Sequence, residues 1–532
     1  MRRVIGIVFL AMLAGGVARR VPAEEAYDLI IANGVIVDGT GRAGYKADVG
    51  IRRGHIAKIG SLNRAPAAAK LDAHGQVVSP GFIDVHVHIE DQVRLSTRRF
   101  SASNFLLQGV TTVITGNCGR SAPDIAAFFA KLGRLKLAIN VATLVGHNTL
   151  RQQVCGARPQ PTPGQMQRLE GLVRAGMRAG ALGFSTGLCY RPGLFAREDE
   201  VVELVRVAAE EQGIYATHLR DEGAEEPAAL AEAVRTAQRA GEPRLHISHV
   251  KAAGRSQWGT ARARLEEARR AAGPSLHLTS DVYPYTSLSS TLEYLVPPEV
   301  YPLVGGTSTA ANFRRAVDLT LARLRRDGWP DYSNVRVAFS EKHKEWIGKT
   351  LPQIVKSEPE GNASGRYQAA WILRNLTRGG VQIIAEEMSE QDVRQVIDAP
   401  GMVFGSDSSV HYPGLGRPHP RGAGTFPRVF AQYVRSQKTL TLEDAVHRAT
   451  GLAAEIFSLP ERGLVREGFW ADLVIFDPQR IEDRATLEDP WKPPEGISAV
   501  IVNGSIAARE GKVTGALAGR PAPRASRPGT RD

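Results

Sequence analysis

The stretch FIDVHVH, residues 82–88, decides how the rest of the chain is interpreted. Its apolar and β-branched residues predict a buried strand, and two histidines separated by one residue stand at its end. Side chains alternate along a strand with a period of two, so His86 and His88 point to the same side and can bind one metal ion together. The stretch therefore predicts a strand that delivers a metal site at its carboxyl end.

Seven further apolar runs follow this stretch, and most of them are separated by segments with helical periodicity. Eight β units with intervening helices predict an α/β protein built on a TIM-like (β/α)8 barrel, here over residues 81–455. An open doubly wound sheet is the alternative, but no glycine-rich phosphate fingerprint follows an early strand. The seven runs are VTTVIT (110–115), LAINVATLVGH (137–147), ALGFST (181–186), GIYATH (213–218), RLHISH (244–249), LHLTSDVY (276–283) and MVFGSD (402–407).

Other segments of the chain are expected outside the barrel. More than 110 residues separate the last two runs, and so long a connection predicts an inserted lid or subdomain at about residues 287–380. Residues 24–80 and 456–515 consist of short β runs with Asn-Gly turns, which predict one small β-sandwich domain assembled from both chain ends. The Pro- and Arg-rich residues 516–532 are predicted to be a disordered tail.

The N-terminus has the layout of a secretory signal peptide. Residues 1–23 combine an arginine pair, an apolar run and small residues at Val21 and Ala23. A membrane anchor is the alternative, but the run is shorter than the ~20 apolar residues that a spanning helix needs. We therefore expect an exported protein, periplasmic or secreted, with no stable membrane insertion after processing.

The net charge does not indicate a nucleic-acid partner. Of the formal charge of +12, residues 1–23 contribute +4 and the last 14 residues +3, which leaves +5 for everything between. Neither an aromatic-interleaved basic stripe nor a nucleic-acid motif accompanies this charge.

Metal-binding residue types stand at the ends of most of the apolar runs, where a barrel places its active site. Imidazole, thiolate and carboxylate together suit zinc, so the runs predict a zinc site. As a thiolate, Cys118 is able to bridge two ions, whereas Cys155 and Cys189 are expected to be buried thiols or, in an oxidising compartment, a pair. The residues are His86 and His88 after the first run, Cys118 after the second, His147 after the third, and His218, His249 and Asp407 after the fifth, sixth and eighth.

Ten motifs give the chain a resemblance to a known family. They are PGFIDVHVH, GVTTVITGNCG, LVGHNTLR, GFSTGLCYRPGLFA, IYATHLRDEG, ISHVKAAG, DVYPYT, GSDSS, HPRGAGTFPRV and GFWADLVIFDP, in this order between about residues 26 and 515. With them the chain resembles the N-acyl-D-amino-acid deacylases (D-aminoacylases) of the amidohydrolase superfamily. The resemblance implies zinc-dependent hydrolysis of a small N-acyl-D-amino acid to a D-amino acid and a carboxylate.

The resemblance also implies roles for individual residues. His86, His88 and Asp407 would form one zinc site, and Cys118, His218 and His249 a second, tighter one. The fourth run ends in Ser185-Thr186 rather than in the carboxylated lysine of many superfamily members, so Cys118 would take the bridging role. Asp407 would be the general base, and Lys251, Tyr283 and Tyr190 would bind the substrate carboxylate. His147 would be an oxyanion donor, a residue that holds a metal ligand in place, or a structural residue.

Three other functions are considered. A cyclic-amide hydrolase of the hydantoinase or dihydropyrimidinase type would share the barrel but usually carries the missing lysine. GFSTG (183–187) matches the G-x-S-x-G nucleophile elbow, but Pro192 and Gly193 block the helix that this elbow requires. A non-catalytic binding protein on the same fold would typically have lost ligands. The sequence indicates neither an oligomeric state nor the preferred side chain and acyl group.

Overall fold

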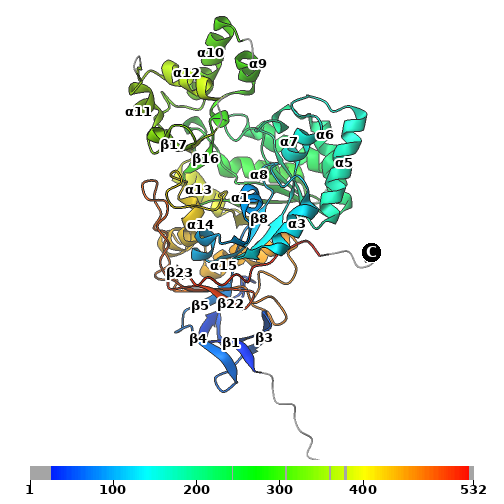
Figure 1. Cartoon of the computed structure of the whole chain (residues 1–532), viewed down its shortest axis with the longest axis vertical. Helices are drawn as coiled ribbons and strands as arrows, with labels where there is room; N and C mark the ends of the chain where they lie inside the picture. The colour runs from blue at the N-terminus through cyan, green and yellow to red at the C-terminus, as the bar shows by residue number, and fades with distance from the viewer. Residues whose placement is uncertain (1–25, 242–243, 306–307, 359–360, 377–379, 526–532) are drawn as a thin grey trace, which may run out of the picture.

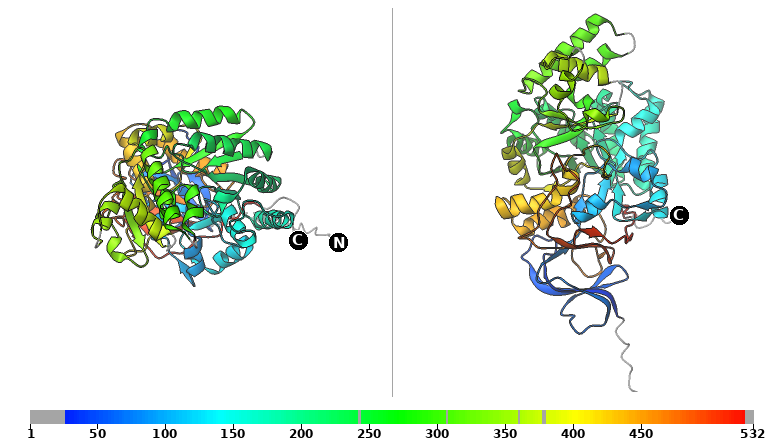
Figure 2. Two further views of the ribbon diagram at one scale, coloured as in Figure 1. Left: turned by 90° about the horizontal axis from the view of Figure 1, so that it is seen from above. Right: turned by 60° about the vertical axis from the view of Figure 1, so that its left-hand side comes forward.

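The computed structural model describes residues 26–241, 244–305, 308–358, 361–376 and 380–525. A small β domain, a barrel and an inserted subdomain lie one after another along the long axis of the molecule (Figures 1 and 2). The signal peptide predicted at residues 1–23 lies outside the described residues. In the part of the chain that is described, no helix has the length and apolar character needed to cross a membrane.

Eight parallel strands of the described chain form the barrel, and each comes from one of the eight apolar runs. They pair in two sets, β6-β8-β10 and β12-β13-β14-β15-β19. The strands are β6 (Phe82–Asp84), β8 (Val110–Thr115), β10 (Asn140–Thr143), β12 (Gly183–Gly187), β13 (Ile214–His218), β14 (Arg244–Ile247), β15 (His277–Val282) and β19 (Met402–Phe404).

Backbone hydrogen bonds join the two sets into a closed ring. The N–H of Leu182 donates to the carbonyl of Thr143 at 2.9 Å and connects β12 to β10. On the opposite side, Asp407 N–H donates to the His86 carbonyl and His88 N–H to the Ser408 carbonyl, both at 2.8 Å. A ring closed in chain order is the expected barrel, and it excludes the open doubly wound sheet.

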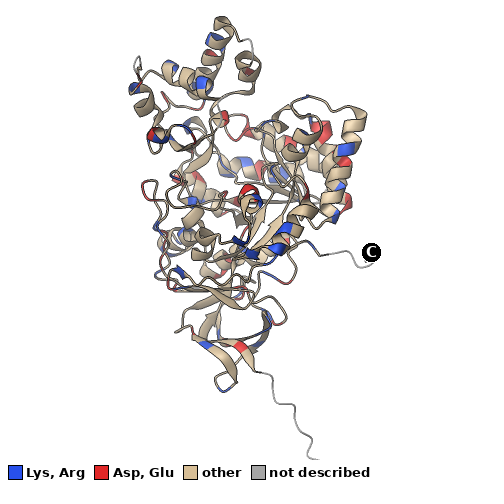
Figure 3. Ribbon diagram, in the orientation of Figure 1, with Lys and Arg blue, Asp and Glu red and all other residues tan. Residues whose placement is uncertain are grey.

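Amphipathic helices cover the outside of the ring. In α5, for example, Leu169, Val173 and Met177 recur at a spacing of four and are buried, and Thr162 caps the helix in a capping box followed by a proline. Acidic and basic residues are interspersed along these helices (Figure 3). The helices are α2 (Ser103–Leu107), α3 (Ile125–Arg134), α5 (Pro163–Arg178), α6 (Glu198–Glu210), α7 (Glu226–Arg239), α8 (Ala261–Ala272), α13 (Glu390–Ile397), α15 (Leu442–Ala449) and α16 (Gly451–Ile456).

Shorter elements lie in the loops around the barrel. Those at the carboxyl ends of the strands matter most for function, because they surround the site described below. The full set of shorter elements is α1 (Glu90–Leu95), β7 (Arg99–Phe100), β9 (Lys136–Leu137), β11 (Val145–Gly146), α4 (His147–Val154), η1 (Gly193–Phe195), η2 (Arg255–Gln257), α14 (Arg421–Arg428) and the π-helix η6 (Val429–Ser436).

The inserted subdomain follows β15 and spans residues 287–386, six residues more than expected. It has its own apolar core, which includes the fully buried Trp371 and Tyr332. Its antiparallel sheet has the order β16-β18-β17. The elements are β16 (Ser287–Thr291), η3 (Leu292–Leu295), η4 (Pro298–Val300), α9 (Tyr301–Val304), α10 (Ala310–Arg326), β17 (Val335–Ser340), η5 (Lys344–Trp346), α11 (Leu351–Lys356), α12 (Gly365–Leu376) and β18 (Val381–Glu386).

The small β domain combines both chain ends, as expected, in one nine-stranded sheet. A bridge between His55 and Trp470 turns β3 back toward the strand β20, so the sheet curls around its own apolar core. The layers of the expected sandwich are therefore parts of one continuous sheet. Its strands are β1 (Tyr27–Ile36), β2 (Tyr45–Arg52), β3 (His55–Gly60), β4 (Ala67–Asp72), β5 (Val77–Pro80), β20 (Leu473–Phe476), β21 (Ile497–Val502), β22 (Ser505–Arg509) and β23 (Lys512–Val513).

Residues 516–525 do not form the disordered tail predicted from their composition. The N–H of Gly519 donates to the Leu137 carbonyl and that of Ala522 to the Val141 carbonyl, both at 2.8 Å, and Ala522 is buried. The segment also completes buried polar groups of the barrel and the β domain. Asn503 Nδ2 donates to the Ala518 carbonyl at 2.7 Å, and Arg520 N–H donates to Asn140 Oδ1 at 3.0 Å. Composition missed this role because backbone groups make most of these contacts.

We predict that deleting residues 517–532 lowers the melting temperature, whereas deleting only 526–532 leaves it unchanged. The longer deletion removes partners of Asn503 and Asn140, and a buried polar group left unpaired costs about 1–3 kcal/mol. Differential scanning calorimetry of the two truncated proteins checks this. Equal melting temperatures would contradict a stabilising role of the segment.

Candidate active site

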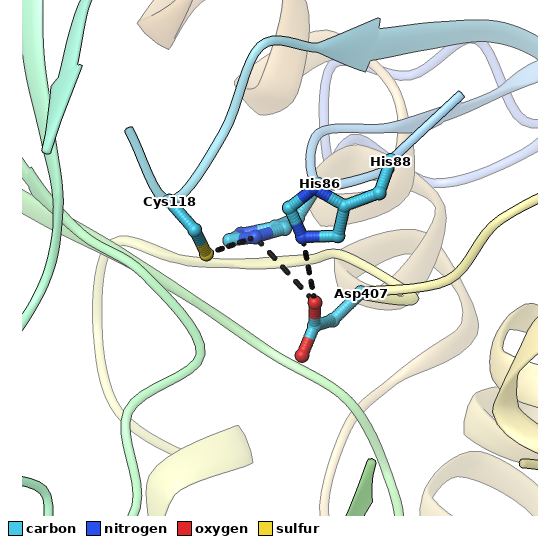
Figure 4. Close-up of side chains that lie close together, drawn as sticks. All are labelled: His86, His88, Cys118 and Asp407. Atoms are coloured by element: carbon cyan, nitrogen blue, oxygen red, sulfur yellow. Dashed lines mark hydrogen bonds and ion pairs between the residues drawn. The ribbon is translucent and has the colours of Figure 1, made fainter. Parts of the chain in front are cut away.

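The six candidate ligands gather at the carboxyl ends of the barrel strands. One group consists of His86, His88, Cys118 and Asp407 (Figure 4), and a second of Cys118, His218 and His249. Within each group the ligand atoms all lie within 4.8 Å of one another. Cys118 belongs to both groups and is the link between them.

The distances around the Cys118 sulfur are short. Cys118 Sγ lies 3.2 Å from His86 Nε2 and 3.5 Å from both His218 Nδ1 and His249 Nε2. Asp407 Oδ1 lies 3.1 Å from His88 Nε2 and 3.7 Å from His86 Nε2. Atoms that bear lone pairs thus surround the sulfur and the carboxylate on the side that faces the cleft.

Three of these ligands have a backbone conformation that L-residues rarely adopt. The φ angles are 51° at Cys118, 33° at His249 and 48° at Asp407. Such left-handed residues cost about 1–3 kcal/mol each and are typical of functional sites. At Gly116 beside Cys118, φ is 83° and a Cβ would lie 2.3 Å from the Leu144 carbonyl oxygen, so the turn requires glycine. The GNCG turn thus holds the thiol in one position.

Two carboxylates contact the imidazoles of His86 and His249 at Nδ1, the ring nitrogen that points away from the Cys118 sulfur. Asp281 Oδ2 lies 3.4 Å from His86 Nδ1, and Asp281 Oδ1 accepts the backbone N–H of His249 at 3.0 Å. Glu222 Oε1 lies 3.0 Å from His249 Nδ1. At His86, a proton on Nδ1 that is donated to Asp281 leaves the lone pair of Nε2 facing the centre of the site. At His249, Nδ1 is held by both Glu222 and the ammonium of Lys251.

The protonation states fit a divalent cation. Burial lowers the pKa of His218 to about 3, and burial together with the charge of Lys251 lowers the pKa of His249, so both rings are neutral at pH 7. Burial raises the pKa of the Cys118 thiol well above its usual value. A thiolate at this place therefore needs a cation among the imidazoles, and this donor set of sulfur, nitrogen and carboxylate oxygen suits Zn²⁺.

Arg421, a residue without a role in the sequence-based prediction, pairs with the candidate base. An Nη of Arg421 lies 2.9 Å from Asp407 Oδ2. Burial alone would raise the pKa of the Asp407 carboxyl, but the charge of Arg421 and the hydrogen bond from His88 hold it well below its usual range. Only 3% of Arg421 is exposed, and its Nε and Nη1 have no hydrogen-bond partner among the described residues. The only signal for it was the motif HPRGAGTFPRV.

An open cleft of about 660 Å³ leads to the ligands. Its walls come from the loops after β6, β8, β12 and β19, from α4, and from β16 of the inserted subdomain. Tyr190, Ser289 and Arg421 line it together with His88, Cys118 and Asp407. This volume is within the usual range of about 300–1,000 Å³ for small-molecule sites.

Of the three residues expected to bind the substrate, Tyr190 belongs to the described residues that line the cleft, whereas Tyr283 and Lys251 do not. Tyr190 lines the cleft, and its ring lies 4.7 Å from that of His218. Tyr283 is buried under Arg421, whose guanidinium carbon is 4.5 Å from the ring centre, and its hydroxyl has no partner among the described residues. Lys251 Nζ lies 2.6 Å from Glu222 Oε1 and 2.9 Å from His249 Nδ1, and Lys251 does not belong to the described residues that line the cleft.

His147 belongs to neither ligand group. It is the first residue of α4 rather than the end of a strand, because the run 137–147 leaves β structure after Gly146. Its Nε2 lies 2.8 Å from Glu200 Oε1, which also accepts from Arg151 at 2.8 Å. The contacts described for the ring thus join it to a buried ion pair between α4 and α6 and not to the candidate ligands.

The serine of the G-x-S-x-G match is not placed as a nucleophile. Ser185 is fully buried, donates to the Gly116 carbonyl at 2.5 Å and accepts from Gly119 N–H at 3.1 Å. It therefore braces the GNCG turn. Cys118, Cys155 and Cys189 are all free, so the pairing considered for the last two is absent from this structure, whose described residues include all three.

The comparisons with known proteins agree with the fold. The model of the amidohydrolase family matches residues 70–281 and 365–508. N-acyl-D-glutamate deacylase of Alcaligenes xylosoxydans xylosoxydans is 34% identical over 504 residues, which cover 90% of this chain and 93% of the relative. D-aminoacylase of the same organism is 32% identical over 521 residues, 93% of this chain and 98% of the relative.

Solved structures give the same result. N-acyl-D-glutamate deacylase from Bordetella bronchiseptica, complexed with zinc and a phosphonate inhibitor that mimics the tetrahedral intermediate, matches with a TM-score of 0.80 and 34% identity. The match covers 94% of this chain and 100% of the other. The L-hydantoinase from Arthrobacter aurescens matches with a TM-score of 0.57 at 18% identity over 94% of this chain and 100% of that chain, and shares the fold alone.

The chain belongs to the amidohydrolase family of metal-dependent hydrolases. Within that family it is similar to the N-acyl-D-glutamate deacylase and the D-aminoacylase just described, over nearly their whole length.

We predict that Cys118→Ala leaves a folded protein with little bound zinc, because both ligand groups lose the same sulfur. Cys155→Ala is the matched control, since this cysteine belongs to neither group. Zinc content after exhaustive dialysis, with circular dichroism to verify folding, checks the prediction. Full zinc content in the Cys118 variant would show that Cys118 is not a ligand.

Proposed function

We propose that this protein is a zinc-dependent deacylase that hydrolyses the amide bond of N-acyl-D-amino acids. The arrangement of Cys118 carries the proposal: one thiol is shared by two ligand groups, and β12 carries Ser185-Thr186 just before its end, where a cyclic-amide hydrolase usually has a bridging lysine. The similarity to two deacylases over nearly the whole chain supports it.

Cys118, His218 and His249 would hold the tighter zinc ion, and His86, His88 and Asp407 a second, weaker one. Both groups fit by residue type, and Asp281 and Glu222 orient the rings of His86 and His249. Zinc, when bound, polarises the scissile carbonyl and lowers the pKa of a water molecule to near 7.

Asp407 would act as the general base. Its low pKa keeps the carboxylate ionised, and Arg421 and His88 hold it between them. It takes the proton from the attacking water and passes it to the amine nitrogen as the C–N bond breaks. Tyr190, in the cleft beside His218, is placed to donate its hydroxyl hydrogen to the carbonyl oxygen of the substrate.

Arg421 and Tyr283 would bind the α-carboxylate of the substrate. The unpartnered Nε and Nη1 of Arg421 and the unpartnered Tyr283 hydroxyl are buried donors beside Asp407. A carboxylate satisfies all of them. Lys251, which we expected to make this contact from the sequence, is occupied by Glu222 and would instead hold His249 in place.

Stereoselectivity would follow from these fixed points. With the carboxylate at Arg421 and the scissile carbonyl at the ligands, two substituents of the α-carbon are fixed. The side chain then points into the cleft for only one configuration, which we assign to the D series. The N-terminal residues 1–23 support export, so the substrate would be met outside the cytoplasm.

A panel of N-acetyl-D- and N-acetyl-L-amino acids tests the function, with released amine as the readout. We expect hydrolysis of D substrates, and a loss of about 10²–10⁴-fold in the Asp407→Asn control, which is the usual contribution of general acid–base catalysis. Hydrolysis of hydantoin or dihydrouracil in place of the D series would favour the cyclic-amide alternative.

A second experiment separates Arg421 from Lys251. A charge-assisted hydrogen bond contributes about 1.5–3 kcal/mol, so Arg421→Met should lower kcat/KM for the acids by about 10- to 150-fold more than for the matching carboxamides. Lys251→Met should affect acids and amides equally, because Lys251 acts through Glu222 and His249. The opposite pattern would show that Lys251, and not Arg421, binds the substrate carboxylate.

A further inference from the structure

His419 is a buried histidine of the cleft wall to which the proposed reaction gives no role. It lies in the loop before α14 and is only 3% exposed. Its Nδ1 accepts the backbone N–H of Arg421 at 3.0 Å, and its Nε2 lies 2.7 Å from the hydroxyl oxygen of Ser287. One ring therefore joins the first residue of α14 to the first residue of β16.

The contact with Arg421 fixes the tautomer of this ring. A ring nitrogen that accepts a hydrogen bond carries no proton, so a neutral His419 has its proton on Nε2 and donates it to the Ser287 hydroxyl. Burial and the charge of Arg421 hold the pKa of His419 well below the usual value of a histidine, which keeps the ring neutral. The ring is rigid, so it holds its two partners at a fixed separation.

The hydrogen bond from the Arg421 N–H caps the beginning of α14. The first N–H groups of a helix have no partner inside the helix, and Pro420, at the capping position, makes no side-chain hydrogen bond to them. The ring of His419 takes the place of a capping side chain. It thereby orients the backbone that carries the Arg421 guanidinium, which lies 2.9 Å from Asp407 Oδ2.

The partner of Nε2 belongs to the segment through which the chain enters the inserted subdomain. Ser287 begins β16, and the last residue of α14 contacts the same segment, because Arg428 Nε donates to the Pro284 carbonyl at 2.6 Å. Residues 284–287 are therefore bound at both ends of α14. The helix that begins with Arg421 is fastened to the base of the insertion.

Arg421 also contacts β16 through its own side chain. Its Nη2 lies 3.5 Å from the Ser289 carbonyl oxygen and donates to the Asp407 carbonyl at 2.5 Å. A displacement of β16 therefore reaches Arg421 by two routes, through the guanidinium and through the ring of His419.

We propose that His419 is a positioning residue: it holds the carboxylate-binding Arg421 in register with β16, so that recognition of the substrate carboxylate depends on the position of the inserted subdomain. The inference rests on the proposed deacylase function and on the role of Arg421 in it. None of the hydrogen bonds described for His419 is to a candidate ligand. Its effect on the reaction is therefore exerted through Arg421.

Three variants test the positioning role, with N-acetyl-D-amino acids and the matching carboxamides as substrates. His419→Leu removes both hydrogen bonds and should lower kcat/KM for the acids by about 10-fold more than for the amides, which corresponds to about one charge-assisted hydrogen bond. Zinc content should stay unchanged. His419→Asn keeps an acceptor close to the place of Nδ1 and should restore most of the ratio. His447→Leu is the matched control, since this ring holds the Gly39 carbonyl at 2.8 Å and is not among the described residues that line the cleft.

Ser287→Ala tests the link to the insertion, because it breaks only the contact of Nε2. We expect it to lower the ratio of acid to amide turnover by about 3-fold, in line with one neutral hydrogen bond. An unchanged ratio would show that carboxylate recognition does not depend on β16. An equal loss on acids and amides in His419→Leu would overturn the positioning role.

The tautomer is tested without any substrate. The ring ¹⁵N resonances of His419, identified by their disappearance in His419→Leu, should show a neutral ring with its proton on Nε2 at pH 7. A proton on Nδ1 would overturn the proposal even if the deacylase function holds. Absence of turnover of both acids and amides by the unaltered protein would instead overturn the proposed function.

Discussion

The buried sulfur of Cys118 sets the main constraint on this molecule. Three imidazoles surround it, of which His218 and His249 have lowered pKa values, and burial opposes the ionisation of the thiol, so a thiolate needs a cation in the middle of the site. The supporting structure follows from this constraint. Ser185 braces the turn that carries the thiol, and Asp281 and Glu222 contact Nδ1 of His86 and of His249. The strained conformations of Cys118, His249 and Asp407 are tolerated because the closed barrel fixes the backbone on both sides of each.

The barrel strands and the gathering of the ligands were predictable from sequence, since both depend on local signals. A buried strand is an apolar run, and a barrel brings the ends of such runs together wherever they lie in the chain. The surrounding contacts were not predictable in this way. Glu222, Asp281 and Arg421 are ordinary charged residues in sequence, and their meaning comes from partners 27, 195 and 14 positions away, His249, His86 and Asp407.

The contacts of His147 favour the structural alternative, and the expectation of a disordered tail failed, for a related reason. His147 ends an apolar run, but that run leaves β structure and begins α4, which turns the ring toward Glu200. Residues 516–525 have the composition of a disordered tail, yet their backbone groups complete the hydrogen bonding of Asn140 and Asn503. Composition carries no information on backbone partners, and periodicity does not reveal where a run changes from strand to helix.

The barrel and the insertion contribute different residues to the cleft, and this has a consequence for substrate specificity. The barrel supplies every candidate ligand, whereas β16 and the turn after it supply Ser289, Ser290 and Glu293 to the cleft wall. The insertion has its own core, and Glu387 fastens its base to the barrel by accepting from Trp258 Nε1 at 2.9 Å and from Trp329 Nε1 at 3.1 Å. Substitutions in the wall therefore alter the fit of the substrate without loosening the ligands, because the two sets of side chains are anchored in separate cores.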